Sequence, residues 1–270
     1  MIMQNRSVIR RFSMLTASFL AAFGFLCVIG INPNTHLAAD VGDASSGSLD
    51  NSLLGSSSRD AVFAQGLRAR KLYGSLERFC TTRHSELEPG SLARAELRAE
   101  WLIALMEKAV ALPKSQREQV WSELQQRADE FDADPIDADG AYAVLVRYQN
   151  AIALANHGAL ERQEWEWISP PDETEIPVAV WDVLRLAYEK LSAIEKDLSD
   201  RVRERGIPGG GAPENDLTLD QLVSLRRFVQ WRMGRVLMEQ GHCFPDGSDD
   251  RLLLIGQARE LLERLATLDI

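Results

Sequence analysis

Cysteine, histidine and basic charge are scarce in this chain of 270 residues. Its three cysteines exclude a dense disulfide scaffold. Its four histidines include no H-E-x-x-H motif and no pair with helical metal-ligand spacing, so we expect no metal site. Acidic residues outnumber basic ones by 40 to 30. The resulting net charge of −10 argues against nucleic acid as a partner, because a general nucleic-acid binder needs basic surface.

Signatures of catalysis are missing as well. No G-x-S-x-G motif occurs, and Gly209-Gly210-Gly211 lacks a following Lys-Ser or Lys-Thr, so it predicts a linker and not a phosphate loop. We therefore expect neither catalytic residues nor a cofactor, and an envelope hydrolase with an unrecognised site is a remote alternative. The acids between 132 and 140 do not fit an EF-hand, because Pro135 and Val146 would occupy ligand positions. They predict a solvated acidic turn, with weak calcium association as the alternative.

The N-terminal residues have the pattern of an export signal. Arg6, Arg10 and Arg11 precede an apolar run over 12–31, and small residues follow up to Ala39. This pattern predicts a secretory signal peptide over 1–39 that is removed after Ala39. The run is also long enough to span a bilayer, so an uncleaved inner-membrane anchor is the alternative. Both interpretations place the rest of the chain outside the cytoplasm, in the periplasm or cell envelope.

The remainder divides into a linker and a helical domain. Residues 40–58 are mainly Ser, Gly and Asp, and they predict a disordered linker. From 59 to 270 the apolar residues recur every three or four positions, and no useful period-two run occurs, which predicts an all-α domain of eight or nine helices. Pro89-Gly90-Ser91 predicts a helix start with Ser91 as N-cap. The glycine- and proline-rich stretch 206–216 predicts a flexible insertion.

A degenerate repeat runs through this domain. Gly74-Ser75-Leu76-Glu77-Arg78 nearly matches Gly158-Ala159-Leu160-Glu161-Arg162. The spacing Ala151-x-x-Leu154-x-x-x-Gly158 matches Gly234-x-x-Leu237-x-x-x-Gly241. We expect the small residue to admit a neighbouring helix, the apolar residue to fill the seam, and the second glycine to end the helix with a positive φ.

On these residues the chain resembles the tetratricopeptide repeat (TPR) family, whose units are helix–turn–helix pairs of 34 residues. The TPR-like positions of one copy are Gly234, Leu237, Gly241, Ala258, Leu262 and Leu265, and those of another are Ala151, Leu154, Gly158, Leu160 and Trp167. Residues 60–87 resemble a third copy. Residues 91–131 predict a helical pair with little of the signature, and the long helix from 178 to about 205 does not fit. The resemblance implies an α-solenoid of stacked antiparallel hairpins; a non-repeating helical bundle is the alternative.

The resemblance also implies a function. A TPR-like solenoid is a non-catalytic scaffold that binds a protein or peptide, and its first helices line the binding face. The polar residues beside the apolar stripes of two such helices are the candidates: Arg147, Asn150 and His157 in one, and Arg227, Gln230 and Arg235 in the other. An ordinary solvated helix face is the alternative. The acidic charge favours basic or neutral partners. A membrane-tethered structural component of the envelope is the alternative function.

Three further sets of residues carry expectations. Cys80 and Cys243 would face an oxidising compartment and could pair, or they could be buried free thiols. We expect all six tryptophans to pack between helices, with partial exposure of one of Trp165 and Trp167 as the alternative. His84 predicts a solvated or capping histidine near a helix end, and His157 predicts a histidine at a helix C-terminus.

Overall fold

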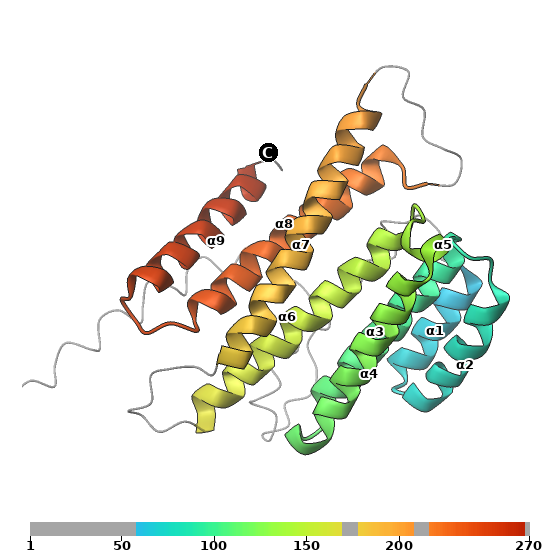
Figure 1. Ribbon diagram of the computed structural model, residues 1–270, viewed down its shortest axis with the longest axis horizontal. Helices are drawn as coiled ribbons and strands as arrows, with labels where there is room; N and C mark the ends of the chain where they lie inside the picture. The colour runs from blue at the N-terminus through green and yellow to red at the C-terminus, as the bar shows by residue number, and fades with distance from the viewer. Residues whose placement is uncertain (1–57, 169–177, 208–215, 268–270) are drawn as a thin grey trace, which may run out of the picture. The chain divides into compact units, whose positions relative to one another are not determined.

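The computed structural model describes residues 58–168, 178–207 and 216–267, and all regular secondary structure in these ranges is helical (Figure 1). They contain nine helices: α1 (Arg59–Ala69), α2 (Tyr73–Glu86), α3 (Leu92–Ala111), α4 (Lys114–Ala133), α5 (Pro135–Ala138), α6 (Ala143–Ile168), α7 (Val178–Arg205), α8 (Leu219–Gly241) and α9 (Asp249–Thr267). The all-α prediction is confirmed for these residues. The predicted signal or anchor (1–39), the predicted linker up to 57 and most of the predicted insertion (208–215) lie outside the described residues.

Side-chain caps begin several of these helices. The Ser91 hydroxyl accepts a hydrogen bond from the Arg94 N–H at 3.3 Å, which confirms the predicted N-cap of α3. At the start of α8, the Thr218 hydroxyl accepts from the Gln221 N–H at 3.3 Å, and the Gln221 side chain accepts from the Thr218 N–H at 2.8 Å. Such reciprocal capping satisfies N–H groups that the first helical turn leaves unpaired, so these local sequences fix where each helix starts.

The longer helices form successive hairpins. Among the described residues, α1 packs on α2, α3 on α4, α6 on α7, and α8 on α9 (Figure 1). The first helix of each later hairpin also contacts the hairpin before it: α3 contacts α1 and α2, α6 contacts α3 and α4, and α8 contacts α7 and, more weakly, α6. The single-turn helix α5 contacts α4. The four hairpins of the described chain are therefore stacked in sequence order.

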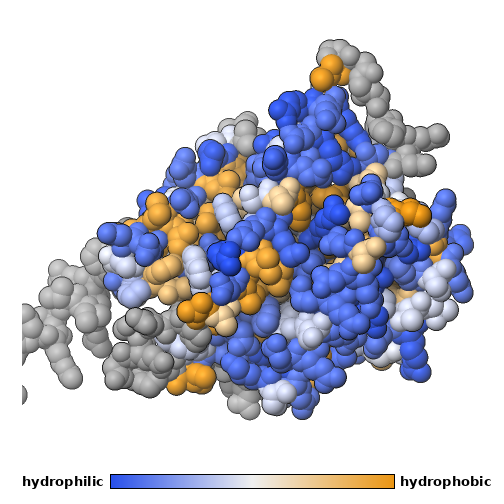
Figure 2. Space-filling model, in the orientation of Figure 1, coloured by the Kyte–Doolittle hydropathy of each residue, from blue (hydrophilic) through white to orange (hydrophobic). Residues whose placement is uncertain are grey.

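The last hairpin leaves apolar side chains at the surface. Helix α9 packs mainly on α8, and Ala258 is its one buried residue among those described. Leu252 and Leu253 of α9 remain 63% and 59% exposed. Figure 2 shows hydrophobic residues at the surface over α8 and α9, next to hydrophilic ones.

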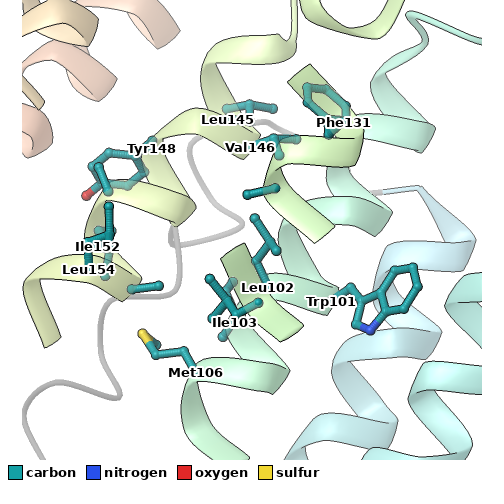
Figure 3. Packing of buried hydrophobic residues seen from close by; sticks show 14 of the residues in the cluster. Trp101, Leu102, Ile103, Met106, Phe131, Leu145, Val146, Tyr148, Ile152 and Leu154 are labelled. Carbon is teal, nitrogen blue, oxygen red and sulfur yellow. The ribbon is translucent and has the colours of Figure 1, made fainter. Parts of the chain in front are cut away.

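The core is densest around α3 and α6. Helix α3 is buried along most of its length because α1, α2, α4 and α6 all contact it. Figure 3 shows Leu102, Ile103 and Met106 of α3 in one cluster with Ile152 and Leu154 of α6. At about 25 cal/mol per Å² of apolar area removed from water, such side chains supply the main driving force for folding.

Charged side chains enter this core in pairs. Arg68 of α1 donates to Glu100 of α3 at 2.9 Å and to Glu107 at 2.6 Å. Glu96 of α3 accepts a hydrogen bond from the Ser58 N–H at 2.8 Å. A buried charge without a partner is costly, so these contacts hold the first hairpin against α3 in one arrangement.

Three glycines allow the helices of the last two hairpins to approach closely. A Cβ atom at Gly158 of α6 would lie 2.6 Å from Cγ of Leu184 on α7. A Cβ atom at Gly234 would lie 2.8 Å from Leu262, and one at Gly241 would lie 2.9 Å from Ile255. The two glycines of α8 and their two partners on α9 are each seven residues apart in the sequence, as expected for antiparallel helices in constant register.

The predicted role of the second glycine as a turn is wrong. Helix α6 continues through Gly158 to Ile168, and Gly241 ends α8 without a positive φ. The described glycines with a positive φ are Gly90 and Gly247. Gly74 lies in the first turn of α2, where a Cβ atom would have no neighbour within 4 Å. The repeated glycines serve close packing in α6 and α8, because a side chain there would overlap a leucine or isoleucine.

We expect Gly158→Ala to destabilise the protein and Gly256→Ala to stabilise it. Overpacking against Leu184 costs about 1–3 kcal/mol, which outweighs the gain in helix propensity. Gly256 lies in α9 with nothing within 4 Å, so the same change there should gain about 0.4–1 kcal/mol. Urea unfolding of both variants gives the comparison. Equal effects of the two changes would contradict the close contact.

Candidate functional site

The six predicted binding residues fall into separate places. Arg147 and Asn150 line a hollow between α4, α6 and α7. Arg227 and Gln230 line another between α8 and α9. His157 stacks on Trp121 of α4, with ring centroids 4.7 Å apart, and Arg235 lies over the ring of Trp231. The structure therefore does not bring the six residues together in one hollow, and each group has its own surroundings.

The hollow between α8 and α9 has a volume of about 350 Å³. We call it the basic hollow, and its lining is Val223, Arg226, Arg227, Gln230, Leu261, Arg264 and Leu265. The lining combines three arginines with three aliphatic side chains and includes no carboxylate. In a chain with a net charge of −10, this is a local concentration of positive charge.

Glu195 of α7 holds two lining residues of the basic hollow in place through hydrogen bonds. It accepts hydrogen bonds from Arg226 at 2.9 Å and from Gln230 at 2.8 Å. Partial burial by itself raises the pKa of Glu195, but the hydrogen bonds from Arg226, Ser199 and Gln230 bring it below its ordinary value. Glu195 therefore remains charged and orients two lining residues. The sequence carried a signal for this role, because Glu195 interrupts the heptad-spaced apolar series of Trp181, Leu184, Tyr188, Leu191, Leu198 and Val202.

An exposed apolar stripe runs along α8 beside the basic hollow. We call it the α8 stripe: Phe228, Trp231 and Met238, which are 40%, 38% and 40% exposed. The guanidinium groups of Arg232 and Arg235 lie 4.7 and 5.3 Å from the centroid of the Trp231 ring. Cation–π contacts of this kind hold the indole in place while part of it stays open to solvent. The three stripe residues were not predicted from the sequence, because exposure of an apolar residue depends on which neighbours cover its helix face.

The hollow beside α6 has a different character. It has a volume of about 340 Å³ and is lined by Asp132, Val144, Arg147, Asn150, Lys190, Ala193, Ile194 and Asp197. Arg147 donates to Asp132 at 3.1 Å and to the Ala138 carbonyl at 2.9 Å, and Asn150 accepts from Gln125 at 3.1 Å. Positive and negative groups here compensate one another within the protein, so this hollow offers less unmatched charge than the basic hollow.

His157 is not at a helix C-terminus, in contrast to the prediction, because α6 continues beyond it. Burial against Trp121 lowers the pKa of His157, so the ring is predominantly neutral near pH 7 and packs as an aromatic side chain. Trp167 lies near the end of α6 and is 71% exposed, so the expectation that all tryptophans pack between helices is wrong for this residue, and the alternative of an exposed residue in the pair is confirmed.

The predicted solvated acidic turn is wrong for its central residues. Asp137 is 2% exposed, and its carboxylate accepts from Arg94 Nε at 2.7 Å and from the Gly90 N–H at 2.8 Å. Asp134 caps α5 and also accepts from Arg94, at 3.1 Å. These two acids bind an arginine at the start of α3, about 40 residues earlier in the chain, which the local sequence gives no means to anticipate. Among the described residues, no group of three or more His, Cys, Asp or Glu side chains could hold a metal ion.

His84 lies next to this cluster in the last turn of α2, so its predicted place near a helix end is confirmed, but it is largely buried and not solvated. Its Nε2 is 3.1 Å from Arg98 Nη2 and 3.9 Å from Asp137. Burial, together with the positive charges of Arg98 and Arg94, lowers the pKa of His84 to about 4, and the nearby acids Asp137 and Asp134 oppose this only in part.

The two described cysteines are free, buried thiols. Cys80 belongs to the main hydrophobic cluster, and Cys243 packs with Val180 and Leu184 in a smaller one. Burial raises the pKa of Cys80 to about 12 and that of Cys243 to about 11. Neither thiol has the lowered pKa that marks a reactive cysteine.

We expect stability to fall as the pH falls from about 6.5 to about 4, partly because of His84. In that window the unfolded chain binds a proton at His84 that the folded chain excludes, so acid favours unfolding. His84→Gln should therefore lose less stability than the wild type between pH 7 and pH 4.5. Urea unfolding at both pH values measures this difference. His157 and His242 titrate in the same direction, so part of the pH dependence should remain; an unchanged slope in His84→Gln would contradict the assignment.

We expect both described cysteines to react slowly with a thiol reagent in the folded protein. In a Cys27→Ser chain, denatured without a reductant, Cys80 and Cys243 should both react with a maleimide. In the native protein at pH 8 both should react far more slowly, because burial disfavours the thiolate. Absence of reactive thiols after denaturation would instead indicate a disulfide.

Comparisons with known proteins add no relative to this description: no protein-family model, no curated protein and no solved structure matches the chain. None of the described helices combines the length and apolarity that crossing a membrane requires. The resemblance to the TPR family therefore rests on the residues quoted above.

Proposed function

We propose that the chain is an exported, non-catalytic interaction module that acts as a scaffold and is built from TPR-like helical hairpins. The ordered stacking of the described hairpins supports this architecture, because each hairpin buries its apolar face against the next one. The glycine contacts within the last two hairpins support it as well, since they use small residues at repeated spacing to bring paired helices together.

The last three hairpins are longer than a 34-residue TPR unit, whereas the α1–α2 hairpin, which covers 59–86, is shorter. The α3–α4 hairpin covers 92–133, and the α8–α9 hairpin covers 219–267. Helix α7, which did not fit the repeat pattern in the sequence, packs against both α6 and α8 and completes the α6 hairpin. We therefore propose an array of TPR-like hairpins of unequal length, in which the last three are enlarged.

The observation that carries the functional proposal is the α8 stripe beside the basic hollow. Binding surfaces of proteins are enriched in tryptophan, phenylalanine, methionine and arginine, and all four residue types occur here on one helix and its neighbour. Three of the six candidates, Arg227, Gln230 and Arg235, belong to this region of α8. We favour them over Arg147 and Asn150, because they lie on the same helix as the exposed apolar residues of the α8 stripe.

Export is proposed from the N-terminal sequence. The basic start and the apolar run over 12–31 support either a cleaved signal or an anchor with the domain outside the cytoplasm. The length of that run favours a second candidate function, a membrane-tethered structural component of the envelope. The mass of the mature chain separates the two, because cleavage after Ala39 would remove the tether.

Site-specific photo-crosslinking tests the proposed binding surface. A benzophenone amino acid placed at Phe228 should crosslink a protein partner in the envelope of the producing cell. The same amino acid placed at Phe63 is the matched control, because Phe63 is also an exposed helical phenylalanine but lies on α1 and is 54% exposed. Arg235→Glu or Trp231→Ala should reduce the crosslink from position 228 about tenfold, as for a central interface residue. Equal products from positions 228 and 63 would contradict the placement, and so would the absence of a product at 228.

A further inference from the structure

We infer that the basic hollow receives an acidic, leucine-bearing segment of the protein partner, with a carboxylate among the arginines and a leucine side chain on the aliphatic floor. This inference rests on the proposed function, because it names the chemistry of the partner at the same surface. It reverses for this one site the expectation from net charge, which favoured a basic or neutral partner.

The charge of the lining is the first argument. Arg226 is partly compensated by Glu195, with which it pairs at 2.9 Å. Arg264 donates to the main-chain carbonyl of Glu260 at 3.3 Å and, within the described residues, pairs with no acidic side chain. The surface of a strongly acidic chain thus retains guanidinium charge at a hollow without carboxylates. Guanidinium groups bind carboxylates through charge-assisted hydrogen bonds, so an acidic ligand complements this lining.

The aliphatic floor is the second argument. Val223, Leu261 and Leu265 line the same hollow as the arginines and are half-buried there. A free ion would leave these side chains uncovered, whereas a leucine next to an acidic residue would cover them and gain about 25 cal/mol per Å² of apolar area. The volume of about 350 Å³ is at the lower end for ligand pockets, so it suits a short peptide segment and not a bulky folded surface.

An anionic membrane surface is the competing occupant, and two features disfavour it. Interfacial membrane-binding helices carry their basic and apolar residues on different faces, whereas here both kinds of residue line one hollow. The net charge of −10 also opposes the approach of the whole chain to an anionic bilayer.

Fluorescence anisotropy with a defined peptide tests the inference on the full chain in nonionic detergent. The probe is a labelled synthetic heptapeptide, Gly-Asp-Leu-Glu-Asp-Leu-Gly. One comparison peptide carries lysine at the acidic positions, and another carries serine in place of leucine. The acidic leucine peptide should bind most tightly, and its affinity should fall as salt rises. Vesicles of phosphatidylglycerol provide the membrane arm.

Two arginines of α9 supply matched variants. Arg264→Glu should weaken binding of the acidic leucine peptide about tenfold, because it replaces an attraction with a repulsion. Arg264→Gln should have a smaller effect in the same direction. Arg259→Glu introduces the same charge change at an exposed residue outside the lining and should change the affinity less than twofold. Circular dichroism confirms that each variant stays folded.

The peptide-binding and crosslinking results together distinguish failure of this inference from failure of the proposed function. Equal weakening by Arg264→Glu and Arg259→Glu would overturn the inference, as would equal binding of the serine peptide or binding to the vesicles in preference to the peptide. If the peptide does not bind but position 228 still crosslinks a protein, the partner chemistry is wrong and the proposed function stands. If position 228 gives no crosslink and the peptide does not bind, both fall.

Discussion

The close approach of paired helices at glycine is the contact on which the last two hairpins depend. Gly158 admits Leu184, and Gly234 and Gly241 admit Leu262 and Ile255. Because these contacts bring α7 against α6 and α9 against α8, they also determine which face of α8 is covered and which stays open. The basic hollow and the α8 stripe are consequences of that packing: both consist of α8 residues and their neighbours that the adjacent helices leave accessible.

In the first half of the described chain, paired charges fix how neighbouring helices are placed against one another. Arg94 joins the α3 start to the acids around α5, and Arg68 joins α1 to α3. Such buried pairs contribute little net stability, but each is costly to break, so they favour one relative placement of the helices. Arg264 of the basic hollow contrasts with them, because among the described residues it pairs with no acidic side chain and lies at the surface of an otherwise acidic chain.

Prediction from the sequence succeeded where local chemistry decides the structure. The spacing of apolar residues indicated the all-α class, and the cap at Ser91 indicated the start of α3. Prediction failed where the burial or backbone conformation of a residue depends on a contact with a residue far away in the sequence. A glycine in a helix has the same local sequence whether it ends the helix or admits Leu184. An acid such as Asp137 is expected to be solvated unless Arg94 is known to reach it. Half of the candidate binding residues, those on α8, lie at the proposed site, while the exposed Trp231 and Phe228 beside them were missed.

The sequence alone determined the helical class, the order of the helices, the acidic charge and the expectation of export, because composition and short-range periodicity encode each of them. Tertiary structure alone decided which helices pair, which charges are compensated and which apolar side chains remain exposed. The physical reason is that burial and ion pairing are properties of neighbours in space. For α8 those neighbours are α7, whose Glu195 holds Arg226 and Gln230, and α9, whose Leu261 and Arg264 complete the basic hollow.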